Sequence, residues 1–497
     1  MTEEEQIRRQ RLGEIRENGI NPYPSRAHRS HECQEVLDNF DELEANKEQI
    51  TVCGRLRAIR KHGGISFINL SDASGNVQIV LHKQDLGDDI FGQFHNMADL
   101  GDFYEFSGNV FLTQRGEQSI KATSTRMLAK SLLPLPEKWH GLTDQEIRYR
   151  QRYLDLIANE ESMAIAKSRA KMVRAMREYL EAQDFLEVET PILQPIPGGA
   201  NARPFVTHHN TLHADLYLRI APELYLKRLV VGGFEKVYEF ARCFRNEGIS
   251  TQHNPEFTQI EAYWAYATIE NLIDHLEGLV KTALHAVTSG SDEITFADTI
   301  ISFKNIERKT FRDVILEHTG IDLDGYKDET DLRNIMVERG INVQNIYGYG
   351  ELVDTLYKHG ARLKIIQPVF VTDYPSAMKP LAKRRENNPF YSASAQLVVM
   401  GMEMCNAFNE LNDPLEQEDR FREQESLREQ GSEEAQRIDE DYITALKHGM
   451  PPTAGYGIGI DRLAMLLTGS DTIKDVILFP TLKPRAIEES ESTEVKE

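Results

Sequence analysis

Residues 238–264 hold the densest set of side chains that could do chemistry. Arg245 and Glu247 follow an apolar run, and Phe257 and Glu261 come after a polar loop. An arginine fork binds phosphate or carboxylate, an aromatic face can stack on a flat group, and carboxylates bind an ammonium group. The stretch could therefore bind a substrate that carries both negative and positive charge.

Two antiparallel strands joined by a long loop are predicted for this stretch. Apolar and polar residues alternate before Arg245 and again after Pro255, which is the period of a half-buried strand. The loop between them carries Gln252, His253 and Asn254. A hairpin whose charges are merely solvated is the simpler interpretation when the stretch is taken alone.

A second polar set lies in a predicted central strand, residues 396–414. Its apolar residues alternate, yet it includes Glu403, Asn406 and Glu410. Burying two carboxylates and an amide is costly unless they meet a cation or a metal ion. This strand is therefore predicted to contribute to a binding site.

Two further stretches could approach a ligand closely. In residues 451–469 the glycines occupy every second position of a predicted strand, which suits a flat group lying against it, and a helix then begins near Arg462. Glu223 follows a proline at a strand–helix junction, and Gly198 and Gly199 precede it and allow close backbone approach. Glycine-rich strands are weak signals when taken alone.

The strings FRNEG, HNPEFT, ELNDP and GIGIDR occur in this order, and together they are specific. They resemble the motifs of class II aminoacyl-tRNA synthetases, in the form found in lysyl-tRNA synthetases, over roughly residues 10–485. FRNEG to HNPEFT resembles motif 2 and GIGIDR resembles motif 3. The helix from Ser162 and the strand that stops at Pro191 resemble motif 1, which forms the dimer interface in that family. The resemblance implies an α+β protein: an N-terminal OB-fold barrel, then a catalytic domain with an antiparallel sheet flanked by helices, acting as a homodimer.

The resemblance also implies which residues would bind the amino acid. Arg245 would bridge the lysine carboxylate and the α-phosphate, and Glu223 would hold the α-ammonium. Acidic residues at the far end of the pocket would select lysine over aspartate or asparagine, which need a cation there. The implied lysine site consists of Glu223, Arg245, Glu261, Tyr263, Asn406, Phe408 and Glu410.

The nucleotide site follows from the same resemblance. Phe257 would stack on adenine, Arg462 would bind the γ-phosphate, and Glu403 would hold Mg²⁺. Arg245 and Arg462 would be the catalytic residues. The implied ATP site consists of Arg245, Glu247, His253, Asn254, Phe257, Glu403 and Arg462.

The implied reaction is ligation of lysine to tRNA through a lysyl-adenylate. A carboxylate nucleophile needs no general base, so positioning and charge neutralisation would supply the catalysis. Two alternatives stay open: a related ligase that lysylates a protein, and an inactive RNA-binding paralogue. The first lacks the barrel, and the second is disfavoured because Arg245, Glu403 and Arg462 are present.

Residues 51–132 are predicted to form a small barrel, because about five short strand-like runs are separated by Gly and Asp turns. Such a barrel is as often structural or protein-binding as nucleic-acid-binding. The segment resembles the anticodon-binding domain of lysyl-tRNA synthetases. That resemblance implies that Phe67 stacks on an anticodon base and that Gln78 and Glu117 read base edges, which suits recognition of unpaired bases.

Composition sets limits on the class of protein. The net charge is −22, from 79 acidic and 57 basic residues, so binding to RNA has to rely on local patches. No membrane span or signal peptide is expected. The four cysteines are widely spaced and contain no CxxC pair, which favours a reducing cytoplasm: Cys33, Cys53, Cys243 and Cys405.

The rest of the chain is divided by changes of pattern. A charged helical extension is expected over 1–50, a hinge over 133–160, a catalytic domain over 161–485 and a disordered acidic tail over 486–497. A helical insertion is expected at about 265–345 within the catalytic domain. A basic group near the hinge would be either a solvated helix face or a contact with RNA backbone: Arg148, Arg150, Arg152 and Arg169.

Three positions depart from the family pattern. Gln252 stands where bacterial relatives usually have arginine, Gln396 where a glutamate helps to bind metal, and Lys379 where a small serine precedes PLA. Two interpretations of the last two positions are open. Gln396 could still bind Mg²⁺ through its amide oxygen, or the Lys379 ammonium could supply charge in place of an ion.

Overall fold

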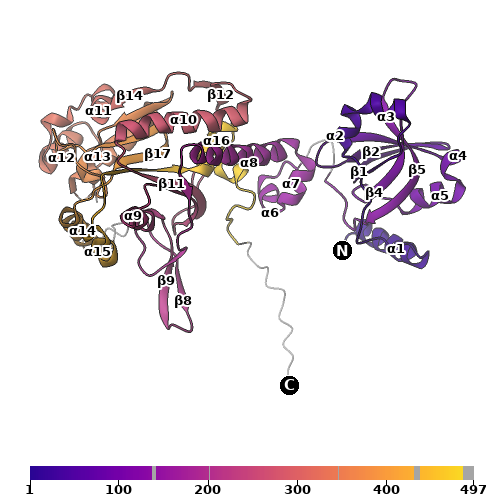
Figure 1. Ribbon diagram of the computed structural model, residues 1–497, viewed down its shortest axis with the longest axis horizontal. Helices are drawn as coiled ribbons and strands as arrows, with labels where there is room; N and C mark the ends of the chain where they lie inside the picture. The colour runs from indigo at the N-terminus through magenta and orange to yellow at the C-terminus, as the bar shows by residue number, and fades with distance from the viewer. Residues whose placement is uncertain (137–141, 201, 345, 347, 430–436, 485–497) are drawn as a thin grey trace. The chain divides into compact units, whose positions relative to one another are not determined.

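The chain divides between Thr143 and Asp144 into two compact units (Figure 1). Each has a hydrophobic core of its own. The acidic tail predicted at 486–497 lies outside the described residues. The computed structural model describes residues 1–136, 142–200, 202–344, 346, 348–429 and 437–484.

The first unit is built around a closed barrel with the strand order β1-β2-β3-β5-β4. Neighbouring strands are antiparallel except β3 and β5. Along β2, the buried Ile68 and Leu70 alternate with half-buried residues, because successive side chains of a strand point to opposite faces. The barrel predicted over 51–132 is thus confirmed as a fold. Its strands are β1 (Ile50–His62), β2 (Ile65–Ser71), β3 (Asn76–His82), β4 (Phe103–Leu112) and β5 (Gln118–Ala129).

Helices of the first unit pack around the barrel. Ile15 of the N-terminal helix and Phe91 and Phe94 of the helix before β4 belong to the barrel core. The N-terminal extension is therefore anchored by apolar contacts. The helices are α1 (Glu3–Glu17), α2 (Cys33–Asp38), α3 (Phe40–Asn46), α4 (Lys83–Leu86) and α5 (Asp88–Met97).

The second unit contains an eight-stranded sheet with the order β14-β15-β16-β17-β18-β11-β10-β6. The two outermost pairs are parallel, and every inner pair is antiparallel. The antiparallel sheet expected for the catalytic domain is confirmed. Its strands are β6 (Leu186–Glu187), β10 (Lys236–Phe244), β11 (Glu256–Ala265), β14 (Glu307–Thr310), β15 (Val369–Thr372), β16 (Ser394–Val399), β17 (Met402–Asn409) and β18 (Thr453–Gly459).

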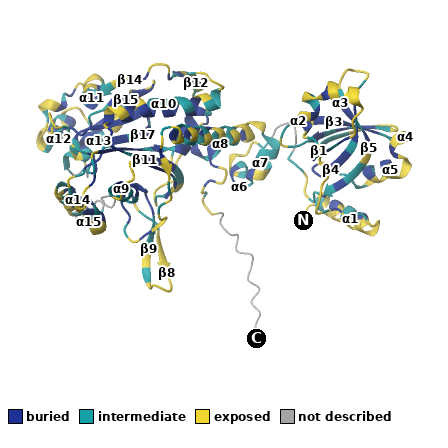
Figure 2. Ribbon diagram, in the orientation of Figure 1, coloured by how far each residue is buried: buried dark blue, intermediate teal, exposed yellow. Residues whose placement is uncertain are grey.

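Helices cover one face of this sheet and bury it (Figure 2). Met172, Met176 and Leu180, which repeat at helical spacing, are fully buried against Ile260 and Ala262 of β11. The apolar period of the sequence therefore identifies the packed face. The covering helices are α8 (Glu160–Glu181), α10 (Ile269–Thr288), α16 (Ile460–Leu467) and α17 (Ile473–Val476).

The alternate residues of β11 face the other side of the sheet. Tyr263 packs there with Leu226 and Leu446 from helices on that side. These elements and a group of short helices surround the site described below. They are α9 (Glu223–Val231), α13 (Gly348–Leu356), η2 (Tyr357–Ala361), η3 (Arg362–Lys364), η4 (Ser376–Met378), α14 (Pro414–Glu429) and α15 (Glu440–Lys447).

The remaining helices and strands show how two predicted segments, the hinge and the insertion, differ from the structure. The hinge predicted over 133–160 includes two helices of the second unit, and the insertion predicted at about 265–345 includes α10, whose side chains belong to the central core. That insertion also contains strands as well as helices. The elements are α6 (Gln145–Arg150), α7 (Arg152–Ala158), β7 (Leu193–Gln194), β8 (Val206–His209), β9 (Ala214–Leu218), β12 (Glu293–Phe296), β13 (Thr299–Ser302), α11 (Phe311–Thr319), η1 (Leu323–Gly325) and α12 (Glu329–Glu338).

The basic group near the hinge binds partners within the second unit. Arg148 and Arg152 both pair with Asp155, and the guanidinium of the buried Arg152 also donates to backbone carbonyls after α16. Arg169 pairs with Asp461 at 2.6 Å. Ion pairs within the second unit account for these three arginines without an RNA partner, and the RNA contact stays a prediction. Within the described ranges, no helix has the length and apolar character needed to cross a bilayer.

Candidate active site

A cavity of about 1000 Å³ lies on the sheet face opposite α8 and α10. Its floor is made by neighbouring strands: Asn406 on β17 pairs with Gly457 on β18, which pairs with Glu261 on β11. The next row is Phe408, Gly455 and Tyr263. The strand pairing thus brings three separate sequence motifs onto one surface.

Gly455 is needed for the shape of this floor. A Cβ atom at this position would lie 2.5 Å from ring carbons of Tyr263 and closer still to an oxygen of Glu410. Real Cβ atoms do not approach so closely, so any other residue would displace both side chains. The predicted role of the alternating glycines, close approach to the strand, fits this geometry.

One end of the cavity is acidic and contains its own counter-ion. Lys227 Nζ lies 2.6 Å from Glu223 Oε1 and also contacts Glu410, and all of these side chains are buried. Its ammonium lies 5.8 Å from the ring centroid of Tyr263. The third carboxylate, Glu261, accepts hydrogen bonds from Gln259 at 2.7 Å and from the Tyr263 hydroxyl at 3.2 Å.

The charges at this end do not cancel. When all three buried carboxylates are ionised, they and the one ammonium leave two negative charges. Burial raises the pKa of Glu261, and the charge of Glu223 adds to that shift. Burial likewise raises the pKa of Glu410 to about 8, with Lys227 opposing the shift. Both carboxylates would therefore gain from additional cations in the pocket.

Lys227 is absent from the predicted site. Burial disfavours its charged form, but Glu223 and Glu410 outweigh that cost and raise its pKa, so it remains an ammonium. It lies four residues after Glu223 on α9, so the i,i+4 spacing of a helix was the available signal. Glu410 does not line the cavity directly: it binds Lys227, and its carboxylate lies over Gly455 beside Tyr263, where a Cβ atom would point.

The other end of the cavity is cationic. Arg245 lies over the Phe257 ring, with Cζ 5.0 Å from the centroid, and Arg462 Nη1 donates to the Glu403 carbonyl at 2.9 Å. Nε of both arginines is buried without a hydrogen-bond partner. In the part of the chain that the structure describes, no carboxylate oxygen lies within 4.0 Å of either guanidinium. Such unpaired donors suit a polyanion.

The loop between β10 and β11 lies at the rim of this end. Glu247 and His253 are exposed there, and both line the cavity. Burial and the charges of nearby arginines, Arg462 foremost, lower the pKa of His253, so the ring is neutral at neutral pH. Asn254 donates to the Glu256 carbonyl at 2.6 Å and accepts from the Thr481 amide at 3.1 Å. Both polar ends of its amide therefore hold the loop in place.

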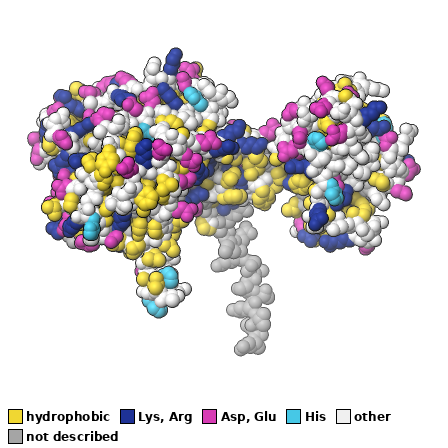
Figure 3. Space-filling model, viewed as in Figure 1, with side chains coloured by type: hydrophobic (Ala, Val, Ile, Leu, Met, Phe, Trp, Pro, Cys, Tyr) yellow, Lys and Arg dark blue, Asp and Glu magenta, His cyan; other side chains and the backbone are white. Residues whose placement is uncertain are grey.

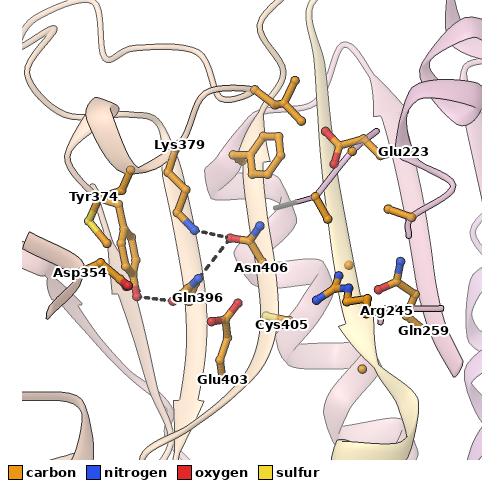
Figure 4. A pocket seen from close by; sticks show the side chains of 18 of the residues that line it. Glu223, Arg245, Gln259, Asp354, Tyr374, Lys379, Gln396, Glu403, Cys405 and Asn406 are labelled. Carbon is orange, nitrogen blue, oxygen red and sulfur yellow. Dashed lines mark hydrogen bonds between the residues drawn. The ribbon is translucent and has the colours of Figure 1, made fainter. Parts of the chain in front are cut away.

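Amide and ammonium groups connect the two ends of the cavity (Figure 4). Lys379 Nζ donates to Asn406 Oδ1 at 2.7 Å, and the Tyr374 hydroxyl donates to Gln396 Oε1 at 2.6 Å. Glu403 lies beside them on β17 and also lines the cavity. Among the residues that the structure describes, no cluster of three or more His, Cys, Asp or Glu side chains could enclose a metal ion by itself.

The predicted anticodon residues lie in the first unit, on the barrel. Phe67 and Gln78 are half-buried and alternate with core residues on β2 and β3, so they face outward. Asn69 pairs with Gln78, and Arg60 on β1 pairs with Phe67, so these residues form adjacent rows on one outer surface. Glu117 is exposed just before β5.

Comparisons with known proteins agree over nearly the whole chain. Residues 144–483 match the model for "tRNA synthetases class II (D, K and N)", and residues 50–128 match that for "OB-fold nucleic acid binding domain". The lysine–tRNA ligase of Carboxydothermus hydrogenoformans is 49% identical over 480 residues, which cover 96% of this chain and 98% of that protein. That of Roseiflexus castenholzii is 49% identical over 98% of this chain and 99% of its own length. The lysine–tRNA ligase of an Enterobacter strain is 45% identical over 97% of both chains. This chain therefore belongs to the lysine–tRNA ligase family of class II aminoacyl-tRNA synthetases.

Proposed function

We propose that this chain activates L-lysine with ATP, forming lysyl-adenylate and pyrophosphate, and then transfers the lysyl group to the 3′ end of tRNA(Lys). The observation that carries the proposal is the charge of the acidic end. Three ionised carboxylates and one ammonium leave two negative charges there, which the two ammonium groups of L-lysine would balance as they displace bound protons. Aspartate or asparagine would meet repulsion or an unpaired buried carboxylate in the same pocket.

The amino acid is oriented by both ends of the cavity. Glu223 binds the α-ammonium, while Glu261 and Tyr263 bind the side-chain ammonium, with Glu410 adding negative charge from its position over Gly455. Asn406 and Phe408 form the wall between these groups. Lys227 keeps Glu223 and Glu410 in fixed positions, which reduces the entropy lost on binding.

Adenylate formation needs alignment and charge neutralisation. A lysine carboxylate oxygen attacks the α-phosphorus and forms a bond to it. The bond between the α-phosphorus and the oxygen that bridges it to the β-phosphate breaks, and pyrophosphate leaves with that oxygen. Arg245 binds the attacking carboxylate and an α-phosphate oxygen with its planar fork. Phe257 stacks on adenine, Arg462 binds the γ-phosphate, and Glu247, His253 and Asn254 form the nucleotide rim.

The donor set also fits one magnesium ion. Mg²⁺ in nucleotide sites keeps several waters and binds one or two carboxylates together with phosphate oxygens. Glu403 offers such a carboxylate, whereas Asp354, which also lines the cavity, pairs with Lys358 at 2.6 Å. A bound ion would neutralise phosphate oxygens. Glu403 would hold it beside the guanidinium groups.

The barrel supplies the tRNA half of the proposal. Phe67 stacks on an anticodon base, and Gln78 and Glu117 read base edges. The support is their position on the outer surface and at a strand end, where an unpaired base can reach them. The final transfer joins the lysyl carbonyl to a hydroxyl of the tRNA 3′ end and releases AMP.

A homodimer in the cytoplasm is part of the same proposal. Hydrophobic side chains gather on the face of the second unit seen in Figure 3. Leu186, Ile192 and Leu193 near the short strands β6 and β7 are 44–50% exposed, which favours a covered interface. The four cysteines are free, in keeping with a reducing compartment. Sedimentation equilibrium should give twice the chain mass, and a monomer would contradict this part.

The experiment that tests the proposed function measures two reactions of the purified chain. Lysine-dependent exchange of pyrophosphate into ATP should occur without tRNA, and charging of tRNA(Lys) should require both substrates. Absence of exchange would exclude a ligase. Exchange without tRNA charging would instead indicate a ligase with another acceptor, such as a protein.

A further inference from the structure

Two cations in the wall opposite Arg245 have no role in the function described so far. Lys379 follows η4, and Arg362 begins η3, directly after the π-helical turn η2. Both line the cavity. The same cavity is lined by Glu403 and by the aromatic residues Tyr357 and Tyr374.

Lys379 is held in one position by its neighbours. Nζ donates to Asn406 Oδ1 at 2.7 Å and lies 4.7 Å from the ring centroid of Tyr374. Figure 4 shows the side chain pointing from the wall toward Asn406. It remains half-exposed only because it faces the cavity. Among the residues with a described position, no carboxylate oxygen lies within 4.0 Å of Nζ.

The surrounding oxygens are already in use. Gln396 Oε1 accepts from the Tyr374 hydroxyl at 2.6 Å, and Asn406 Oδ1 accepts from Lys379 at 2.7 Å and from Gln396 Nε2 at 3.4 Å. A metal ion bound to either amide oxygen would have to compete with these donors and with a neighbouring ammonium. On this wall, Glu403 is the carboxylate that remains for an ion.

Arg362 extends the positive charge toward the other end. It lines the same cavity as His253 and Arg462, and its charge helps to lower the pKa of both groups. Its Nε is buried without a hydrogen-bond partner. Three guanidinium groups and one ammonium, those of Arg245, Arg362, Arg462 and Lys379, thus line the cavity together with Glu403.

We propose that Lys379 and Arg362 are fixed cations that bind phosphate oxygens of the reacting nucleotide, so that adenylate formation here needs fewer divalent ions than carboxylate ligands would recruit. Lys379 donates to Asn406, which belongs to the proposed amino-acid subsite, and lines the same cavity as Glu403 of the nucleotide subsite, and it binds an oxygen near the α-phosphorus. Arg362 binds an oxygen farther toward the γ-phosphate. Burial lowers the pKa of Lys379, with Glu403 opposing the shift, and nearby phosphate oxygens would favour its charged form. Neither cation donates a proton while the phosphoryl bond forms and pyrophosphate departs.

This inference rests on the proposed function, and its first test does not depend on turnover. Calorimetry in EDTA should detect binding of a non-hydrolysable ATP analogue to the wild-type protein. Lys379→Met and Arg362→Met should each weaken that metal-free binding about tenfold or more, and by less in saturating Mg²⁺. Lys358→Met is the matched control, because it removes a cavity-lining cation that already pairs with Asp354. It should change the affinity less than twofold.

The second test counts ions. Mn²⁺ bound per site with the ATP analogue, followed by electron paramagnetic resonance, should rise by one in the Gln396→Glu/Lys379→Ser double variant. An equal count in both proteins, or metal-free binding that Lys379→Met and Arg362→Met leave unchanged, would overturn the inference. Lysine-dependent pyrophosphate exchange by the wild type at saturating Mg²⁺ distinguishes failure of the proposed function from failure of this inference. If exchange occurs while both tests fail, the function stands and only the inference is lost.

Discussion

The two ends of the cavity handle their charges in opposite ways. At the acidic end, Lys227 pairs with Glu223 and Glu410 inside the protein. At the cationic end, Arg245 and Arg462 have no carboxylate partner within 4.0 Å among the described residues. A guanidinium stays charged without a partner, whereas buried carboxylates take up protons unless a cation is near. The acidic end is therefore assembled before substrate arrives, and the cationic end is completed by substrate.

Breaking the acidic end should have the largest effect. Removing one partner of a buried ion pair leaves an uncompensated charge and costs ~3–5 kcal/mol. Lys227→Met and Glu410→Ala should each lower the free energy of unfolding by about that amount in urea titrations, and each should abolish lysine activation. The Lys227→Met/Glu410→Leu double variant should recover part of the stability. Single variants as stable as the wild type would contradict the pairing.

Breaking the cationic end should remove activity without loss of stability. Arg245→Gln deletes a charged donor that acts on the transition state, and such losses cost about 10²–10³ in kcat, or ~2.7–4 kcal/mol. The free energy of unfolding should stay equal or rise, because repulsion with neighbouring arginines decreases. Pyrophosphate exchange and urea titration on the same preparation measure both quantities. A large loss of stability would remove the contrast between the two ends.

A change in the barrel should affect neither end. Phe67→Ala should weaken tRNA charging by ~1–3 kcal/mol, the usual contribution of one stacked base. Pyrophosphate exchange should be unchanged, because the residue lies in the separate first unit. Equal loss in both reactions would mean that Phe67 only supports the barrel.

Sequence patterns predicted which side chains of a strand share a face of the sheet, but not the register between neighbouring strands. Alternation along β11 indicated that Phe257, Glu261 and Tyr263 share a face, and the structure agrees. Pairing of Glu261 with Gly457, and of Gly457 with Asn406, depends on contacts between distant segments. The motif resemblance supplied that information, since local periodicity cannot.

The errors of prediction have a common physical origin. Arg148 and Arg152 formed a basic group in the sequence, but in the fold both pair with the buried Asp155, and Arg152 also donates to backbone carbonyls. Arg362 lies in a segment without chemical pattern and reaches the cavity through the turn after α13. A charge has a partner or lacks one only after folding, so charge patterns alone could not separate these cases.

The smallest predicted effect concerns pH. Because burial raises the pKa of Glu410 to about 8 and raises that of Glu261, the empty pocket holds protons at neutral pH. The lysine ammonium groups must displace them, so lysine should bind more tightly as pH rises from 6 to 8. For each proton released, the affinity for lysine should rise at most tenfold per pH unit, which corresponds to ~1.4 kcal/mol. Calorimetry in buffers of different ionisation enthalpy should detect proton release. Proton uptake would contradict the assignment.

The central claim is that two unbalanced negative charges select a substrate with two ammonium groups. Titration of the wild-type protein with lysine, norleucine and 6-aminohexanoate tests it directly, because the analogues each lack one ammonium. Lysine should bind at least about a hundredfold more tightly than either analogue, since each lost charge–charge hydrogen bond costs ~3 kcal/mol. Norleucine binding as tightly as lysine would contradict the account.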